Sequence, residues 1–396
     1  LLERPVVMAT ATLSKGYLKR LIEELRGRPA PASVELHLCL GERGLSYYKS
    51  LASTSLHGLD PEYRAHYDEY RRVARTEVSK APMADDVLRA RDYARTVLVF
   101  CNTVRRAIDV YMRLRGEVEG VTLLHGRFTE ADRDVKLRMI GERLERGEEL
   151  VVVSTQVLEA GVDLDFDCIV TEAAPPSSLI QRAGRALRRL EELRDIGGPS
   201  VIVNVSDESI KSAEAVYPRE VVKGAVRRLV DYLGVGRPGF FDWRFTVEKP
   251  CFTDLLAAAE YAPDYDYGVD ACLNRLLELR VLAEGSIPQL IREVDEYMRG
   301  ALVRDAALVP LLVERRGVVP VSLDYVRRKC SSVLEMRGEA IVAQLAVGDS
   351  LVEREVKLRQ LLKQPLTTLH KLEIGEAEFL GIKVREGVYD CEVGLP

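Results

Sequence analysis

Short apolar runs alternate with amphipathic stretches in the middle of the chain. The runs are VLVFC, VTLLH, LVVVS, CIV and VIVNV, at 97–101, 121–125, 150–154, 168–170 and 201–205. Two stretches between them, 103–116 and 130–147, are helix-like, and the first places apolar residues at the period of about 3.6 residues that marks a half-buried helix. Continuous apolar strands separated by helices predict a parallel α/β sheet with helices on both faces.

Polar residues follow several of these runs directly. In parallel α/β sheets, ligands bind beyond the carboxyl ends of the strands. The candidate positions are therefore Asn102 and Thr103, the turn His125–Arg127, Thr155 and Gln156, and the loop EAAPPSS at 172–178.

The pattern changes on both sides of this block. Residues 41–95 contain a polar, tyrosine-rich stretch and predict a connector. Residues 207–396 lose the regular alternation, with helical runs such as 221–234 followed by short strand-like pieces. They predict a separate, mixed and mainly helical accessory domain.

Composition narrows the possible partners. The 396 residues carry a net charge of −5, which excludes a uniformly basic coat, so any site for a polyanion must be a local patch. No apolar run reaches the roughly 18 residues that a membrane span needs. The seven cysteines lie far apart without a C-x-x-C pair, which predicts reduced thiols in a cytoplasmic protein and no metal site.

One segment that carries candidate chemistry is STQVLEAGVDLDFD, at 154–167. A buried strand ends at Ser154 and Thr155, where a hydroxyl and free backbone N–H groups could hold a phosphate. Gly161 allows a close backbone turn, and Asp163 could accept hydrogen bonds from a ribose. The alternative is an ordinary strand–loop–strand in which Asp163 caps a turn.

The second segment is QRAGRALRR, at 181–189, where four arginines lie together. On a helix over these residues, Arg185 and Arg188 are three apart and share a face, with Gln181 on the same side. Two guanidiniums on one face suit phosphate oxygens, which they bind bidentately. The alternative is a solvated basic face of a helix.

Taken together, the segments VLVFCNT, LLHGRFTEADR, STQVLEAGVDLDFD and QRAGRALRR resemble the second RecA-like domain of superfamily-two helicases. Within that superfamily they are most similar to the CRISPR-associated helicase of type I interference systems. The resemblance covers residues 1–206 well, and the closing GVYDCEVGL at 387–395 also resembles the end of that helicase. It assigns 1–40 to the end of the first RecA-like domain and 96–206 to the second.

The resemblance also implies roles for single residues. The residues implied to contact nucleic acid are Asn102, Thr103, Arg127, Thr155 and Gln156. The residues implied to act on the nucleotide are Gln181, Arg185 and Arg188, and those implied to bind it are Gly161, Asp163 and Arg182. Arg182 is also expected to brace the domain interface. Arg185 and Arg188 would stabilise charge on the γ-phosphate of ATP, as arginine fingers do.

The first residues resemble a coupling motif. The segment ATATL at 9–13 is similar to the motif that ends the first RecA-like domain, so Thr10 and Thr12 would couple hydrolysis to strand movement. The sequence has no G-x-x-x-x-G-K-[ST] and no D-E-x-H or D-E-A-D box. The resemblance therefore implies that ATP and Mg²⁺ are bound mostly by a first domain outside this chain, and that this chain alone is inactive.

The expected function is ATP-dependent translocation on single-stranded DNA in CRISPR interference against foreign DNA. The expected partners are that DNA, a CRISPR surveillance complex, a separate nuclease subunit and an N-terminal helicase half, with no membrane. Two alternatives stay open. One is a repair or RNA helicase of the same superfamily, and the other is a non-catalytic nucleic-acid-binding fragment.

Overall fold

A computed structural model describes residues 15–26, 36–49, 51, 54–159, 162–259, 308–348, 350–363, 368, 372 and 377–396. The chain divides into two compact units. The α/β unit comprises residues 7–125 and 137–263, and the C-terminal unit comprises residues 1–6, 126–136 and 264–396. Thr10, Thr12 and Gly161, to which the sequence assigns coupling and nucleotide-binding roles, lie outside the described residues.

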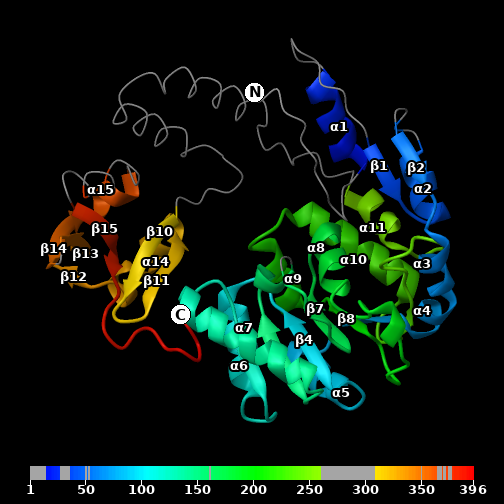
Figure 1. Cartoon of the computed structure of the whole chain (residues 1–396), viewed down its shortest axis with the longest axis horizontal. Helices are drawn as coiled ribbons and strands as arrows, with labels where there is room; N and C mark the ends of the chain where they lie inside the picture. Colours follow the sequence, from blue (N-terminus) through cyan, green and yellow to red (C-terminus); the bar gives the residue numbers. More distant parts are fainter. Residues whose placement is uncertain are drawn as a thin grey trace. The chain divides into compact units, whose positions relative to one another are not determined.

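The α/β unit is built around a seven-stranded sheet with the strand order β5-β6-β4-β7-β8-β3-β9. Figure 1 labels β4, β7 and β8 of this sheet. The strands are β5 (Val121–Leu124), β6 (Leu150–Ser154), β4 (Thr96–Phe100), β7 (Cys168–Glu172), β8 (Val201–Asn204), β3 (Arg75–Ser79) and β9 (Gly239–Phe240). Neighbouring strands are parallel except β3 and β9, which are antiparallel. The five apolar runs form β4 to β8, and the predicted RecA-like parallel α/β fold is confirmed.

Helices connect and cover these strands. They are α5 (Met83–Arg91), α6 (Val104–Leu114), α7 (Glu130–Glu145), α8 (Pro176–Ala183), α9 (Asp207–Glu214), α10 (Arg219–Leu233) and α11 (Phe252–Ala259). α5 packs on β4 and β7, α6 on β5 and β6, and α8 and α9 on β7. α6 buries Ala107, Val110, Tyr111 and Leu114, the face that its helical period predicts.

The sheet extends on both sides of the interval 96–206. β3 and α5 lie inside the predicted connector at 41–95, and α9, α10 and α11 follow residue 206 within the same unit. β3 has a polar sequence, RTEVS, so it gives a weak strand signal. Its buried Glu77 and Ser79 are satisfied by Arg89 and Asp86 at 2.7 Å each.

Smaller elements precede β3. They are α1 (Lys15–Arg26), β1 (Leu36–Cys39), α2 (Glu42–Tyr48), β2 (Thr54–His57), α3 (Pro61–Ala65) and α4 (Tyr67–Val73). β1 and β2 form a parallel pair. Tyr67 and Tyr70 of α4 pack against Phe245 in an aromatic cluster that also includes Tyr63 of α3. Residues 54–73 of the predicted connector thereby reach the loop that follows β9.

The C-terminal unit contains a six-stranded sheet in the order β11-β10-β15-β13-β12, with β14 paired to β13. Its elements are β10 (Leu308–Val313), β11 (Gly317–Ser322), α14 (Leu323–Val333), β12 (Met336–Arg337), β13 (Ala340–Val347), β14 (Ser350–Lys357), α15 (Leu358–Lys363) and β15 (Ala377–Lys383). Strands therefore predominate among the described residues after 308, whereas the described residues 207–259 of the same predicted domain are mainly helical. β10 buries Val309, Leu311 and Val313 at the period of two that marks a strand.

Candidate functional site

Asn102 lies directly after β4, and its side chain is used inside the protein. The Asn102 amide donates to the carbonyl of Ala173 at 2.9 Å and accepts from Arg182 at 3.0 Å, and only 3% of Asn102 is exposed. Thr103 is the N-cap of α6, where its hydroxyl accepts the backbone N–H of Arg106 at 3.2 Å. The Asn102 side chain is therefore engaged within the protein in this conformation, and its contact with nucleic acid, like that of the half-buried Thr103, stays a prediction.

Gln156 connects two strand ends. It begins the short 3₁₀ turn Gln156–Leu158 after β6, and its amide donates to the carbonyl of Asn102 at 2.9 Å and to the Tyr217 hydroxyl at 3.2 Å. Thr155 is buried beside it, with 4% of its surface exposed. Asn102 and Gln156 are therefore in direct contact, and of the four predicted residues after β4 and β6, Asn102 and Thr155 are buried.

Arg182 is the centre of this buried arrangement. Its side chain is completely buried, and its guanidinium lies 5.3 Å from the ring of Phe100. Its five N–H donors reach the Glu159 carboxylate at 2.7 Å, the Thr171 hydroxyl at 3.0 Å, the Glu172 carbonyl at 3.5 Å, the Asn102 amide at 3.0 Å and the Tyr217 hydroxyl at 3.3 Å. In this conformation the Arg182 side chain fixes the motif segments to one another, and its contact with the nucleotide stays a prediction.

Arg185 and Arg188 converge on one carbonyl group, that of Val162. Arg185 donates to this oxygen and to the carbonyl of Glu159 at 2.7 Å, and Arg188 donates to the Val162 oxygen at 3.3 Å. Arg188 also pairs with the exposed Asp163 at 3.1 Å. Burial lowers the pKa of Arg185, and the neighbouring guanidinium of Arg188 adds to that effect. The two predicted arginines and Asp163 are thus brought together at one place.

The sequence predicts a helix over residues 181–189, but Arg185 and Arg188 do not lie on a helix. α8 ends at Ala183, and Gly184 is its C-cap. The chain then forms a bridge between Ala186 and Phe166, and Leu187 has a φ of 55°, in the left-handed region. That conformation costs about 1–2 kcal/mol for a residue with a Cβ atom. The shared face predicted for Arg185 and Arg188 therefore arises from an irregular turn.

Asp165 holds this turn from one side. Its two carboxylate oxygens accept the backbone N–H groups of Arg188 and Arg189 at 3.2 Å each. Burial raises the pKa of Asp165, and the two backbone hydrogen bonds oppose that shift. A cavity of about 500 Å³ lies beside the segment, with Asp163 and Asp165 in its wall. That volume is in the range of small-molecule sites.

Gln181 and Arg127 complete the set of predicted residues that can be placed. Gln181 lies half-buried in the last turn of α8. Arg127 belongs to the C-terminal unit, where its guanidinium lies 4.4 Å from the ring centre of Tyr325 and its carbonyl accepts the N–H of Leu395 at 3.0 Å. Burial lowers the pKa of Arg127. The contact of Arg127 with nucleic acid stays a prediction.

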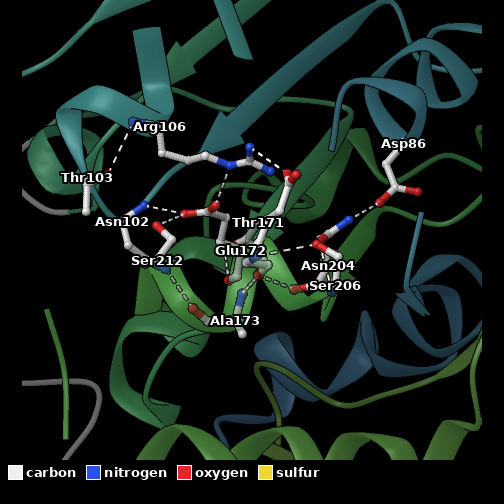
Figure 2. Close-up of polar contacts among 12 residues, drawn as sticks. Asp86, Asn102, Thr103, Arg106, Thr171, Glu172, Ala173, Asn204, Ser206 and Ser212 are labelled. Carbon is white, nitrogen blue, oxygen red and sulfur yellow. Dashed lines mark hydrogen bonds and ion pairs between the residues drawn. The ribbon is translucent and has the colours of Figure 1, made fainter. Parts of the chain in front are cut away.

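Glu172 is a charged residue at a strand end that the sequence motifs do not identify. Its fully buried carboxylate accepts from the backbone N–H of Asn102 and the hydroxyl of Ser212, both at 2.7 Å, and from Arg106 at 3.0 Å (Figure 2). Arg106 also pairs with Glu208 at 2.8 Å. Burial raises the pKa of Glu172, against the effect of these hydrogen bonds. The sequence does carry one signal for Glu172, because this carboxylate ends an apolar strand and begins the loop EAAPPSS.

Asn204, at the end of β8, belongs to a similar internal network (Figure 2). Its amide donates to the Asp86 carboxylate and to the carbonyl of Ala81, both at 2.7 Å, and accepts from the Ser206 hydroxyl at 2.7 Å. Asp86 also accepts from Arg89 at 2.8 Å. The polar groups of Asn204 and Asp86 are satisfied by hydrogen bonds within the protein, so the carboxyl end of β8 has a structural role.

The described residues contain neither a candidate metal site nor a candidate membrane span. Among them, no group of three His, Cys, Asp or Glu side chains has an arrangement that could hold a metal ion. Within the same part of the chain, no helix is both long and apolar enough to cross a membrane.

The chain is similar to known proteins over parts of its length. Residues 93–191 match the family model described as CRISPR-associated nuclease/helicase Cas3, C-terminal. The CRISPR-associated nuclease/helicase Cas3 of Methanothermobacter thermautotrophicus is 35% identical over 143 residues, which cover 35% of this chain and 16% of that protein. The ATP-dependent helicase Lhr-Core of Sulfolobus acidocaldarius is 36% identical over 251 residues, 57% of this chain and 28% of that protein.

A solved structure is similar at a lower level. The crystal structure of T. fusca Cas3-ATP superposes with a TM-score of 0.39 at 23% identity, over 52% of this chain and 26% of that chain. The family match over 93–191 confirms the resemblance to the C-terminal part of a CRISPR-associated helicase for that segment. This chain spans only a small part of the length of the relatives that it matches.

Proposed function

We propose that this chain supplies the second RecA-like half of an ATP-dependent DNA helicase or translocase that acts in CRISPR interference against foreign DNA. The observation that carries the proposal is the convergence of Arg185 and Arg188 on the carbonyl of Val162, beside Asp163. The segments that build this place lie within residues 93–191, the part of the chain that matches the Cas3 C-terminal model.

In the proposed mechanism, Arg185 and Arg188 stabilise negative charge that develops on the γ-phosphate of ATP. Both guanidiniums donate to neutral carbonyl oxygens in the described conformation. Hydrogen bonds to a charged acceptor are about twice as strong, so phosphate oxygens can replace those carbonyls. Arginines in this role contribute about 10³ to 10⁵ to the rate of phosphoryl transfer. Mg²⁺, when bound, would neutralise phosphate charge, with its ligands on the first RecA-like domain.

The remaining residues have supporting roles in the proposal. Asp163 is exposed and lies in the wall of the adjacent cavity, where its carboxylate can accept from a ribose hydroxyl. Arg182 keeps the two motif segments in register through its pair with Glu159. Thr103 faces a single DNA strand at the carboxyl end of β4. The proposed partners are single-stranded DNA, a CRISPR surveillance complex, an N-terminal helicase half and a separate nuclease subunit.

One observation favours a second candidate, a repair or RNA helicase of the same superfamily. The similarity to the ATP-dependent helicase Lhr-Core extends over 57% of this chain, further than the 35% covered by the Cas3 of M. thermautotrophicus. Both candidates use the same arginine pair, so the nucleic acid and the partner complex distinguish them.

The test is ATP hydrolysis by a polypeptide that joins this chain to a first RecA-like domain with a phosphate-binding loop and a Mg²⁺-binding acid. We expect stimulation by single-stranded DNA, little stimulation by RNA, and no hydrolysis by this chain alone. We also expect retention on a surveillance complex bound to its DNA target. Stimulation by RNA without that retention would select the second candidate. Hydrolysis by this chain alone would contradict a shared ATP site.

A further inference from the structure

Arg244 contacts the arginine segment from a distant part of the sequence. It lies in the loop after β9, and its Nη1 atom donates to the carbonyl of Leu187 and to the carbonyl of Arg188, both at 2.8 Å. Its Nε atom donates to the hydroxyl of Tyr63 at 2.5 Å, and its guanidinium lies 5.5 Å from the centre of that ring. One side chain therefore joins α3 to the turn that carries Arg188.

The loop that carries Arg244 is itself held firmly. Asp242, which is fully buried, accepts the backbone N–H groups of Arg244 at 3.1 Å, Phe245 at 2.7 Å and Val247 at 2.9 Å. Phe245 is also fully buried, and Tyr63 packs on it with ring centres 4.6 Å apart. Arg244 thus extends from a rigid base, which is the condition for one side chain to fix the position of another segment.

The turn needs such support. Leu187 has a left-handed φ of 55°, and no regular helix or strand includes residues 187–189. Asp165 accepts the N–H groups of Arg188 and Arg189, whereas Arg244 donates to the carbonyls of Leu187 and Arg188. The peptide groups 187–188 and 188–189 are therefore held from both sides: Asp165 accepts their N–H groups, and Arg244 donates to their carbonyl oxygens.

We propose that Arg244 is a positioning residue for the arginine pair: it fixes the backbone at Leu187 and Arg188 so that Arg188 lies beside Arg185. This inference rests on the proposed function, because the arginine pair is its object. An arginine suits the position, since its planar fork serves two carbonyls and a hydroxyl at once, whereas a lysine is a point charge on a flexible stem. Through Tyr63, the same contact links α3 to the arginine pair.

The first readout needs only this chain. Hydrogen–deuterium exchange is measured for the peptide that covers residues 186–193 in Arg244→Ala, Arg244→Lys and Tyr63→Phe. We expect exchange to become about tenfold faster or more in Arg244→Ala and Arg244→Lys, since each lost hydrogen bond to a charged group is worth roughly that factor. Tyr63→Phe should give a smaller increase. Arg71→Ala is the matched control, because Arg71 pairs with Glu248 of the same loop and, within the described part of the chain, makes no hydrogen bond or ion pair with Leu187 or Arg188.

The second readout is ATP hydrolysis by the polypeptide that joins this chain to a first RecA-like domain. Arg244→Ala should lower kcat about tenfold and change KM for ATP less than about twofold, as expected when only the transition state loses stabilisation. Arg71→Ala should match the wild type, and melting curves show whether each variant is folded.

Unchanged exchange at 186–193 in Arg244→Ala would overturn the positioning role, and so would full recovery of kcat by Arg244→Lys. The proposed function fails in a different way. If the wild-type polypeptide hydrolyses no ATP, that function is contradicted, whereas the exchange of residues 186–193 still decides whether Arg244 holds the turn.

Discussion

Arg182 and Glu159 form an ion pair at 2.7 Å in which the arginine is completely buried and one tenth of the carboxylate side chain is exposed. The pair joins α8 to the turn after β6, so it connects two motif segments that are separate in the sequence. Removing one partner of a buried pair leaves the other charge without compensation. We therefore expect Arg182→Met to lower the free energy of unfolding by about 3–5 kcal/mol.

Urea denaturation of the chain measures this loss. Arg189→Ala is the control, since Arg189 is mostly exposed and its pair with Glu192 lies on the surface. Such pairs contribute at most about 1 kcal/mol. A loss below about 1 kcal/mol in Arg182→Met would mean that the buried network does not hold the motif segments together.

Arg185 and Arg188 should matter for turnover more than for ATP binding. In the polypeptide with both RecA-like domains, we expect Arg185→Ala and Arg188→Ala to lower kcat by about 10³ or more, with small changes in nucleotide affinity. Arg→Lys at either position should recover little, because lysine lacks the planar fork. Arg189→Ala should be nearly silent, since Arg189 pairs with Glu192 and makes no described bond to Val162.

Steady-state hydrolysis with saturating single-stranded DNA, together with nucleotide affinity for each variant, checks this prediction. Arg189 serves as the control because of its contacts in the structure, and not because of a helical arrangement as the sequence suggests. A helix over 181–189 would turn Arg189 away from Arg188, but the helix ends at Ala183. Equal damage from Arg189→Ala and Arg185→Ala would make the cluster a general basic surface.

Several features of the fold and site were predictable from the sequence for a physical reason. Buried parallel strands need continuous apolar sequences, so β4 and β6 stand out. The segments 154–167 and 181–189 lie close together because they follow β6 and β7, which flank β4 in the same parallel sheet. The turn at Leu187 was not predictable, because a left-handed leucine has no local sequence signal, and the helical spacing of Arg185 and Arg188 favours a helix.

Other features depend on partners far along the chain. Asn102 follows a strand and carries an amide, which suits a nucleic-acid contact, yet Ala173 and Arg182 satisfy that amide. Arg244 follows no motif and reaches Leu187 only because the loop after β9 folds back. Sequence patterns show which residues are available for a site, whereas hydrogen-bond satisfaction between distant residues decides which of them stay available.

Glu172 should make part of the stability depend on pH. Burial raises its pKa in the folded chain above the ordinary value of 4.5, so the folded state binds its proton more tightly than the unfolded state. The stability contributed by the protonated group is complete below pH 4.5 and is lost as the pH rises through the raised pKa. Wild type should therefore lose stability relative to Glu172→Gln over that window.

Unfolding free energies of the two proteins, measured from pH 4 to 8, test the sign. Arg106 pairs with Glu172 and lowers the pKa of that carboxyl, whereas burial raises it. The change of the stability difference with pH therefore shows which of the two effects is larger. If the wild type gained stability relative to Glu172→Gln as the pH rose, the ion pair with Arg106 would outweigh burial, and the pKa of Glu172 would be lowered.

The last prediction concerns single-stranded DNA, which we expect this chain to bind weakly, with strong dependence on salt and little dependence on sequence. Thr103 remains at the strand-end edge, and the exposed Arg105 lies next to it in the first turn of α6. Phosphate contacts of this kind give affinity without reading bases. Arg105→Ala should therefore weaken binding and reduce the slope of log K against log salt by about 0.7, the value for one phosphate on a single strand.

Arg113 provides the matched control, because it lies near the other end of α6, is mostly exposed and pairs with Glu117 at 3.1 Å. Fluorescence anisotropy with a labelled oligonucleotide at several salt concentrations gives both affinity and slope. Equal effects of Arg105→Ala and Arg113→Ala would indicate diffuse attraction to a charged surface. An affinity that stays constant between low and high salt would remove phosphate contacts from the proposal, because counterion release would then make no contribution to binding.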